Sequence, residues 1–175
     1  RIDTSSLALQ RVQVGDSIAV DGVCLTATQV GASHFCADVS DETLRCTTLG
    51  DLRSGSWVNL ELAVTPATPL GGHLVTGHVD GVGEVVERKP AGGSERWRFR
   101  VPEGLERYIA AKGSIAIAGV SLPINCVEGQ ELELNLIPHT LEATNLGRLG
   151  PGDPVNIEVD LVARYVERLL SCQVQ

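Results

Sequence analysis

The chain repeats itself, and this repeat constrains the fold more than any other feature of the sequence. Residues 17–63 align without a gap on residues 114–160, at an offset of 97 positions, and 17 of the 47 aligned pairs are identical. SIAVDGVCLTATQV corresponds to SIAIAGVSLPINCV, and VNLEL corresponds to VNIEV. A repeat of this length predicts two copies of one small domain, which we place at residues 1–70 and 71–160, followed by a separate tail at residues 161–175.

The aligned copies differ at several polar positions. Cys24 aligns with Ser121, and Asp21 aligns with Ala118. A shared framework with different polar residues is expected of two pockets with unequal roles. A structural duplication that has drifted would show the same pattern, so the repeat alone leaves both interpretations open.

The second copy is preceded by a segment that the first copy lacks. Residues 71–97, GGHLVTGHVDGVGEVVERKPAGGSERW, lead into the second copy, and their counterpart would lie before Arg1. We therefore expect about two dozen residues of the first copy, including its first strand, to be missing from the sequence.

Composition argues against several functional classes. The formal net charge is −8 and there is no basic cluster, which disfavours a nucleic-acid or anionic membrane surface. No apolar run approaches the ~20 residues of a membrane-spanning helix, and no signal peptide is visible. The five cysteines form no CxxC pair, so neither a zinc ribbon nor a thioredoxin-type site is expected. We expect a reduced, cytoplasmic protein that holds no metal.

Short β-branched runs separated by Gly, Asp and Ser indicate an all-β fold. RWRFRV, ELELNLI and VNIEVDL alternate polar and apolar residues as half-buried strands do, and WVNLELAV and LVTGHVDGVGEVVE are predicted as further strands. Strands at this spacing predict a small antiparallel barrel in each copy. We expect short helical turns at residues 41–46 and 138–143, a helix at residues 103–112 and a weaker one at residues 6–14.

The tail has a different periodicity. In DLVARYVERLL the apolar residues fall at positions 161, 162, 165, 166, 169 and 170, which is helical spacing with one apolar stripe. The stripe is suited either to cap its own barrel or to pack against copies of itself, and we favour the second. Residues 64–72, VTPATPLGG, are rich in Pro and Gly and are predicted to link the two copies.

A thiol and a hydroxyl are predicted to share one side of a strand in the first copy. Cys24 and Thr26 are two residues apart, so their side chains point the same way. Ser121 presents the corresponding hydroxyl in the second copy, where Pro123 replaces the threonine. Without further context, a buried and inert cysteine is the favoured interpretation of Cys24.

Two histidines stand in GGHLVTGHVDG. His73 and His78 are five positions apart, and on a strand this offset puts them on opposite faces, which argues against a metal site built on both. Asp160 precedes the tail helix and is well placed to be its N-cap. The residues alone therefore predict a duplicated β-barrel protein with two pockets for a small polar ligand, and they do not name that ligand.

Six motifs together closely resemble the riboflavin synthase family. They occur in order from about residue 13 to residue 170: GDSIAVDGVCLTAT, ETLRCTTLGDL, GGHLVTGHVDGVGEV, KGSIAIAGVSL, LIPHTLEATNLG and VNIEVDLVARYVERLL. The resemblance implies two tandem, similar six-stranded Greek-key β-barrels followed by a C-terminal α-helix. It also implies a homotrimer formed through these helices, with possible association with lumazine synthase.

The resemblance implies a reaction as well. Members convert two molecules of 6,7-dimethyl-8-ribityllumazine into riboflavin and 5-amino-6-(D-ribitylamino)uracil by moving a four-carbon unit between them, without cofactor or metal. The reactive site is implied to form between the N-terminal barrel of one subunit and the C-terminal barrel of its neighbour. Two unequal copies suit this reaction, because donor and acceptor are the same compound in different roles.

The resemblance also implies roles for individual residues of this sequence. Cys24 matches the family's functionally important cysteine and His78 its proposed base, while Ser17, Ser121 and Asp160 match polar residues of the reactive interface. These five are the candidate catalytic residues. The implied substrate-binding positions are Cys24, Leu25, Thr26, Asp38, Val39, Ser40, Asp41, Glu42, Thr43, Gly77, His78, Val79, Lys112, Ser121, Leu122, Pro123, Asn135, Leu136, Ile137, Pro138, His139 and Thr140.

Two positions depart from the family's pattern. Pro123 stands where the family usually has Thr, and Ala118 where it usually has Asp. Non-catalytic lumazine-binding fluorescent proteins share the double barrel and tend to carry Pro at this place, but they generally lose the Cys and His pattern. Cys24 and His78 are both present here, so we expect an enzyme and keep a lumazine- or flavin-binding protein as the alternative.

Overall fold

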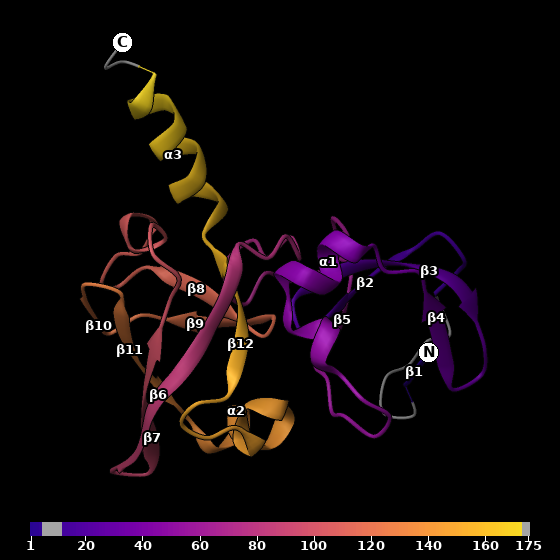
Figure 1. Ribbon diagram of the computed structural model, residues 1–175, viewed down its shortest axis with the longest axis horizontal. Coiled ribbons are helices and arrows are strands. Elements are labelled where there is room, and N and C mark those ends of the chain that lie inside the picture. The colour runs from indigo at the N-terminus through magenta and orange to yellow at the C-terminus, as the bar shows by residue number, and fades with distance from the viewer. Residues whose placement is uncertain (5–11, 173–175) are drawn as a thin grey trace.

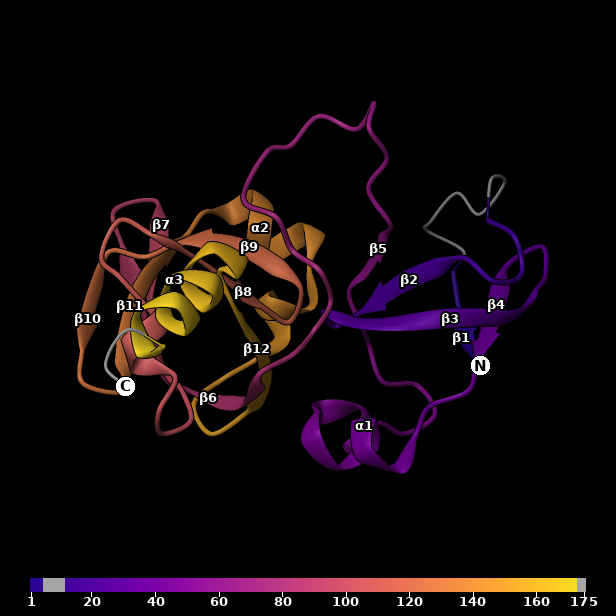
Figure 2. The same ribbon diagram turned by 90° about the horizontal axis from the view of Figure 1, so that it is seen from above.

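The computed structural model describes residues 1–4 and 12–172. The chain forms two β-domains that lie side by side, and the C-terminal helix projects away from the second domain (Figure 1). The linker after the first domain loops out and returns between the domains (Figure 2). Within the described residues, no helix has the length and apolar character needed to cross a membrane.

The first domain is a five-stranded antiparallel sheet in the order β1-β4-β3-β2-β5. A short helix, α1, and a 3-10 turn, η1, follow β4. The elements are β1 (Ile2–Asp3), β2 (Ser17–Val20), β3 (Val23–Val30), β4 (His34–Ala37), α1 (Asp41–Cys46), η1 (Thr48–Asp51) and β5 (Leu60–Leu62).

The second domain is a seven-stranded antiparallel sheet in the order β10-β11-β7-β6-β12-β8-β9. Its elements, with the terminal helix, are β6 (Gly81–Ala91), β7 (Ser94–Arg100), η2 (Glu106–Tyr108), β8 (Ser114–Ile117), β9 (Val120–Pro123), β10 (Cys126–Glu128), β11 (Glu131–Leu136), α2 (Pro138–Ala143), η3 (Asn145–Arg148), β12 (Pro154–Val159) and α3 (Leu161–Ser171).

The repeat of the sequence is a repeat of the fold. The helices α1 and α2 begin 97 positions apart, and so do the strands β2 and β8. The unbroken β3 corresponds to β9 and β10 together, which are one strand interrupted between Pro123 and Cys126. Counted this way the second domain has six strands, and the prediction of tandem all-β domains followed by a helix is confirmed.

The two domains differ in how their sheets end. In the second, β6 lies between β7 and β12 and joins the two halves of the sheet. In the described part of the first, no strand corresponds to β6, so β1 and β5 are both edge strands. The predicted strand run at residues 74–87 begins only at Gly81, because residues 74–80 are held by contacts other than a sheet ladder.

Matching hairpin turns bring the domains together. Asp21 and Gly22 have φ of 47° and 78°, and Ala118 and Gly119 have 48° and 79°, so both turns use the left-handed conformation of tight hairpins. A Cβ on Gly22 would lie 2.7 Å from the Gly119 nitrogen, and one on Gly119 would lie 2.7 Å from the Gly22 nitrogen. Only glycine permits this reciprocal contact.

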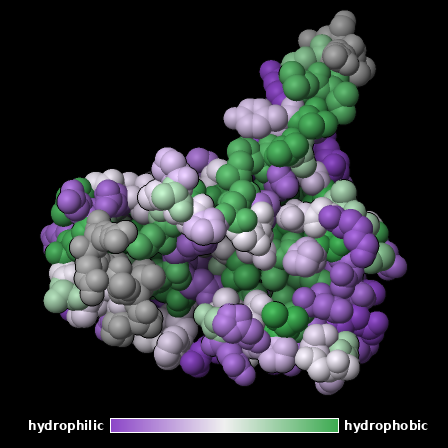
Figure 3. All heavy atoms as spheres, turned by 180° about the vertical axis from the view of Figure 1, so that it is seen from behind, coloured by the Kyte–Doolittle hydropathy of each residue, from purple (hydrophilic) through white to green (hydrophobic). Residues whose placement is uncertain are grey.

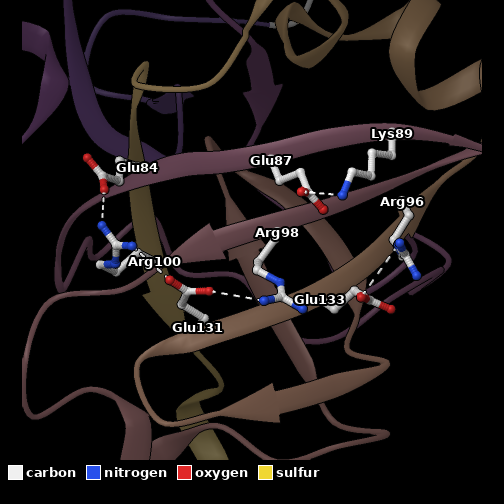
Figure 4. A network of polar contacts seen from close by, with 8 residues as sticks. All are labelled: Glu84, Glu87, Lys89, Arg96, Arg98, Arg100, Glu131 and Glu133. Carbon is white, nitrogen blue, oxygen red and sulfur yellow. Dashed lines mark hydrogen bonds and ion pairs between the residues drawn. The ribbon is translucent and has the colours of Figure 1, made fainter.

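Each domain has its own apolar core. Phe35 and Ile18 are fully buried in the first, and in the second Trp97 and Phe99 stack with ring centroids 5.6 Å apart. The outer face of β6, β7 and β11 instead carries alternating charges (Figure 4). There Arg100 lies 2.5 Å from Glu84 and 2.7 Å from Glu131.

Besides the tail helix, three predicted helices can be checked, and one prediction was wrong. The turns at residues 41–46 and 138–143 are confirmed as α1 and α2. The helix expected at residues 103–112 is reduced to η2, because Gly104 has φ of 89° and so short a segment does not sustain a helix alone. Most of the weaker helix expected at residues 6–14 lies outside the described residues.

The tail helix is confirmed as α3. Asp160 is its N-cap, as expected, and its carboxylate accepts a hydrogen bond of 2.9 Å from the Val162 nitrogen. The apolar stripe does not cap its own domain, since Val162, Tyr165 and Leu169 are each more than 60% exposed. Figure 3 shows this stripe as a continuous apolar surface along the helix.

Candidate functional site

A cleft of about 830 Å³ lies between the domains. Strands β2 and β5 form one wall, and the turn Ala118–Ser121 and the start of η3 form the other. The segment from Thr68 to Gly77, which extends the predicted linker into the second copy and is called the linker below, covers it. Two aligned pairs line the cleft, Gly22 with Gly119 and Cys24 with Ser121, because the turns that join the domains continue into β3 and β9.

Cys24 enters the cleft from β3. It is half-buried, lies opposite Ala19 of β2, and its backbone nitrogen donates a 2.8 Å hydrogen bond to the Gly77 carbonyl. A Cβ on Gly77 would lie 2.7 Å from the Cys24 Cβ, so the linker passes against this residue at a point that requires glycine. Ser17, another predicted site residue, lines the same cleft.

Ser121 enters the cleft from β9 and is joined to His73. Its Oγ lies 2.8 Å from His73 Nδ1 and also accepts a 3.3 Å hydrogen bond from the His73 nitrogen. A Cβ on Gly72 would lie 2.3 Å from this hydroxyl, so the pair needs glycine beside it. The His73 Nε2 is buried and has no hydrogen-bond partner among the described residues.

A buried carboxylate fixes the linker where it meets Cys24. Glu158 of β12 is 3% exposed and accepts hydrogen bonds from the Thr76 nitrogen at 2.8 Å, the Thr76 hydroxyl at 2.6 Å and the Gly77 nitrogen at 2.9 Å. Neither Glu158 nor a His73–Ser121 pair is predicted from the sequence. Both copies carry Glu at this aligned position, so the sequence gives no sign that Glu158 is buried whereas Glu61 is exposed.

Two asparagines cross-link the domains with the symmetry of the repeat. Asn156 donates to the Asp21 carbonyl at 2.9 Å, and the aligned Asn59 donates to the Ala118 carbonyl at 2.9 Å. Their side-chain oxygens accept from the Thr48 nitrogen at 2.8 Å and from the aligned Asn145 nitrogen at 2.7 Å. The cleft is therefore built on a rigid, reciprocal interface.

One charge breaks this symmetry. Asp21 has no acidic counterpart, because Ala118 occupies the aligned position. Its Oδ1 accepts from the Asn59 nitrogen at 2.7 Å and from the Asn145 amide at 2.9 Å. Burial raises the pKa of Asp21 to about 6, and these hydrogen bonds only partly oppose the shift.

The other predicted site residues lie outside the cleft. The stretches Asp38–Thr43 and Asn135–Thr140 occupy aligned positions where β4 and β11 lead into α1 and α2, and most of their residues are exposed. Thr26 and Pro123 are exposed on β3 and β9, and Lys112 is exposed with φ of 67°. His78 is exposed and follows Gly77, whereas Asp160 caps α3; the structure brings neither into the cleft.

The cleft combines a thiol, hydroxyls and an imidazole. These groups suit addition of a nucleophile and transfer of protons at an uncharged ring system. Among residues 1–4 and 12–172, no three His, Cys, Asp or Glu side chains are grouped to hold a metal ion. All five cysteines are free.

Comparison with known proteins decides the family to which the chain belongs. The model of the lumazine binding domain matches the chain twice, over residues 1–63 and 76–160. A riboflavin synthase from Photobacterium phosphoreum is 45% identical over 97% of this chain and 78% of the relative. The chain belongs to the riboflavin synthase family. A second member of this family, from Mycobacterium bovis, is 49% identical over 89% of the chain and 80% of the relative.

Solved structures agree with the family assignment. LumP complexed with 6,7-dimethyl-8-(1'-D-ribityl) lumazine superimposes with a TM-score of 0.80 at 26% identity, covering 90% of this chain and 85% of LumP. LumP complexed with riboflavin gives a TM-score of 0.79 at 28% identity, over 86% and 82% of the two chains. The resemblance noted in the sequence motifs is thus confirmed at the level of family and fold.

Proposed function

We propose that this chain converts two molecules of 6,7-dimethyl-8-ribityllumazine into one riboflavin and one 5-amino-6-(D-ribitylamino)uracil. The observation that carries the proposal is the 41–49% identity to riboflavin synthases over most of the chain, with the Cys24 position intact. A four-carbon unit leaves one lumazine and joins the other. The reaction is a transferase reaction between two identical substrates.

The proposed reaction makes use of the duplication. Each copy supplies one lumazine site, and holding both molecules in reacting geometry converts an encounter of two solutes into a step within one complex. The ribityl chains are held by the polar stretches Asp38–Thr43 and Asn135–Thr140, and the ring systems by backbone groups around Thr26, Lys112 and Pro123. Because the four-carbon transfer has no net oxidation or reduction, the reaction needs no redox cofactor.

Three side chains are proposed to act on the reacting atoms. The Cys24 thiol, or its thiolate, adds to the electron-poor ring of one lumazine and leaves again after the transfer. His78 removes a proton from the acidic C7 methyl group of a substrate. Ser121, oriented by its hydrogen bond to His73, places a polarised hydroxyl beside the second substrate, and Ser17 lines the same cleft.

The tail helix is proposed to assemble the enzyme. The exposed apolar stripe of α3 has no partner among the described residues of its own chain and fits a homotrimer in which the helices pack together. Such a trimer would bring Asp160 of one subunit toward the N-terminal domain of the next. We propose domain limits of residues 1–70, 71–160 and 161–175, a cytoplasmic location, and association with lumazine synthase as a further possibility.

The decisive experiment is cofactor-free turnover. Purified protein is mixed with 6,7-dimethyl-8-ribityllumazine alone, and riboflavin is followed by its absorbance. The proposal expects one riboflavin for every two lumazines consumed. Tight binding of lumazine without conversion would instead establish a carrier protein, the alternative to which the similarity to LumP and the proline at position 123 point.

A further inference from the structure

The buried carboxylate of Glu158 is the strongest polar feature that the proposed chemistry does not use. It lies on β12 of the second domain, is 3% exposed, and is absent from the ion pairs that the described residues form. Its charge is compensated by three donors from two adjacent residues, Thr76 and Gly77. Burying a carboxylate is costly unless such hydrogen bonds satisfy it, so this contact fixes the linker firmly.

The peptide held by Glu158 is the one that touches Cys24. The Gly77 nitrogen binds Glu158, while the Gly77 carbonyl accepts the hydrogen bond from the Cys24 nitrogen. Gly77 has φ of 79° and no room for a side chain against Cys24. A carboxylate of the second domain is therefore connected through a single residue to the candidate nucleophile of the first.

A second contact aligns the same segment on β12. Three residues after Gly77, the Asp80 nitrogen donates to the Ile157 carbonyl at 2.8 Å, and the Asp80 carboxylate accepts from the Val159 nitrogen at 2.8 Å. His78 thus lies between two fixed points, Gly77 and Asp80. The position of residues 76–80 therefore depends on the Glu158 side chain and on two backbone groups of β12 rather than on a continuous sheet ladder.

The repeat provides an internal comparison. Glu61 occupies the aligned position in β5, and it is exposed, with no hydrogen bond from its side chain among those of the described residues. A shared origin therefore explains why a glutamate is present at both positions, but it does not explain why one of them is buried. The burial of Glu158 follows from the linker that packs over it.

We infer that Glu158 is a positioning residue, which holds the Thr76–Gly77 peptide against Cys24 and thereby sets the relative places of the Cys24 thiol and His78. Glu158 itself does not touch the substrates. The consequence for turnover rests on the proposed function, whereas the consequence for Cys24 does not. A small displacement of a reacting group costs about 10²-fold in rate, so loss of this contact is expected to lower kcat strongly.

The first test measures the reactivity of Cys24 without any substrate. Glu158→Gln puts an amide NH₂ against the backbone donors, so it weakens the contact while keeping the size of the side chain. The full-length protein is treated with iodoacetamide, and alkylation of Cys24 is followed by peptide mass spectrometry, with exposed Cys46 as the reference within the same chain. We expect the Cys24 rate to rise about fivefold relative to Cys46, because the linker no longer covers it.

The second test uses a pair of variants that are easier to fold. Thr76→Val removes the hydroxyl donor and keeps the shape, whereas Thr76→Ser keeps the donor. We expect Thr76→Val to lower kcat about three- to tenfold with the lumazine dissociation constant changed less than twofold, and Thr76→Ser to stay close to the parent protein. Glu128→Gln, which removes an exposed charge of β10, is the control for the loss of a carboxylate.

The outcomes separate the inference from the proposed function. Unchanged Cys24 alkylation in folded Glu158→Gln, or equal kcat in Thr76→Val and Thr76→Ser, would overturn the positioning role. If Glu158→Gln does not fold, as judged by circular dichroism, the threonine pair decides alone. If the parent protein forms no riboflavin, the proposed function fails, and the alkylation rates of Glu158→Gln and the threonine pair still decide the role of Glu158.

Discussion

The aligned positions 24 and 121 reach the same cleft from the two domains, and they are treated differently there. Cys24 contacts the linker through its backbone and keeps its thiol uncommitted, whereas Ser121 is joined through its hydroxyl to His73. The backbone around the two positions is alike, and the aligned Asn156 and Asn59 make matching hydrogen bonds to the opposite domain. Duplication therefore conserved the scaffold while the groups facing the cleft acquired unequal chemistry.

The domains also differ in how completely they are closed. The second has β6 between β7 and β12, a larger buried core and an ion-pair network on its outer face. The described part of the first has two edge strands and a smaller core. The second domain is therefore the more complete support, and its residue Glu158 holds the linker that covers the cleft.

The largest loss of stability is expected at positions 99 and 2, which the same 97-residue offset relates through their strand partners Leu132 and Phe35. Phe99 is fully buried in β7, while Ile2 of β1 is only half-buried. Phe99→Ala should lower the free energy of unfolding by about 3–5 kcal/mol, and Ile2→Ala by about 1 kcal/mol. Denaturant unfolding monitored by circular dichroism measures both, and equal losses would contradict the proposed difference in closure.

The next effect concerns the charge that only the first domain carries. Because the folded pKa of Asp21 is raised to about 6, the folded chain binds more protons than the unfolded chain between pH 4 and 6. The free energy of unfolding should therefore fall as pH rises through this window. Asp21 accounts for up to about 3 kcal/mol of this loss, which is complete above about pH 6.

Asp21→Asn tests that assignment directly. The amide oxygen still accepts from the Asn59 nitrogen and the Asn145 amide, but it carries no charge. We expect the variant to be more stable than the parent at pH 7.5 and to lose the slope between pH 4 and 6. Denaturant midpoints across that range provide the measurement, and an unchanged slope would show that another group is responsible.

Particular residues show what the sequence could and could not predict. The 97-residue offset predicted the paired strands and the turns α1 and α2, because local pattern and repetition agreed. The helix at residues 103–112 failed because Gly104 and tertiary packing override a weak helical pattern. The roles of His73 and Glu158 were not predictable, because a contact between residues 48 or 82 positions apart leaves no local signal.

The smallest effect is expected from the ion pairs of the second domain. Arg100 pairs with Glu131 and, with Arg98, lowers the pKa of this carboxyl, so the pairing is present at neutral pH and is lost on acidification. Glu131→Gln should lower the melting temperature by only about 1–2 °C in low salt and not at all in 1 M NaCl, since exposed pairs are screened. A larger, salt-independent loss would indicate a structural role.

The central claim is that the two copies supply unequal groups to one reaction, and Cys24→Ser tests it most directly by making positions 24 and 121 alike. Riboflavin formation and lumazine binding are measured on the same preparation, with Cys126→Ser as the control at an exposed cysteine. We predict a fall in kcat of at least about tenfold, a lumazine dissociation constant within about twofold of the parent, and no change in the control. Full turnover in Cys24→Ser would contradict the account.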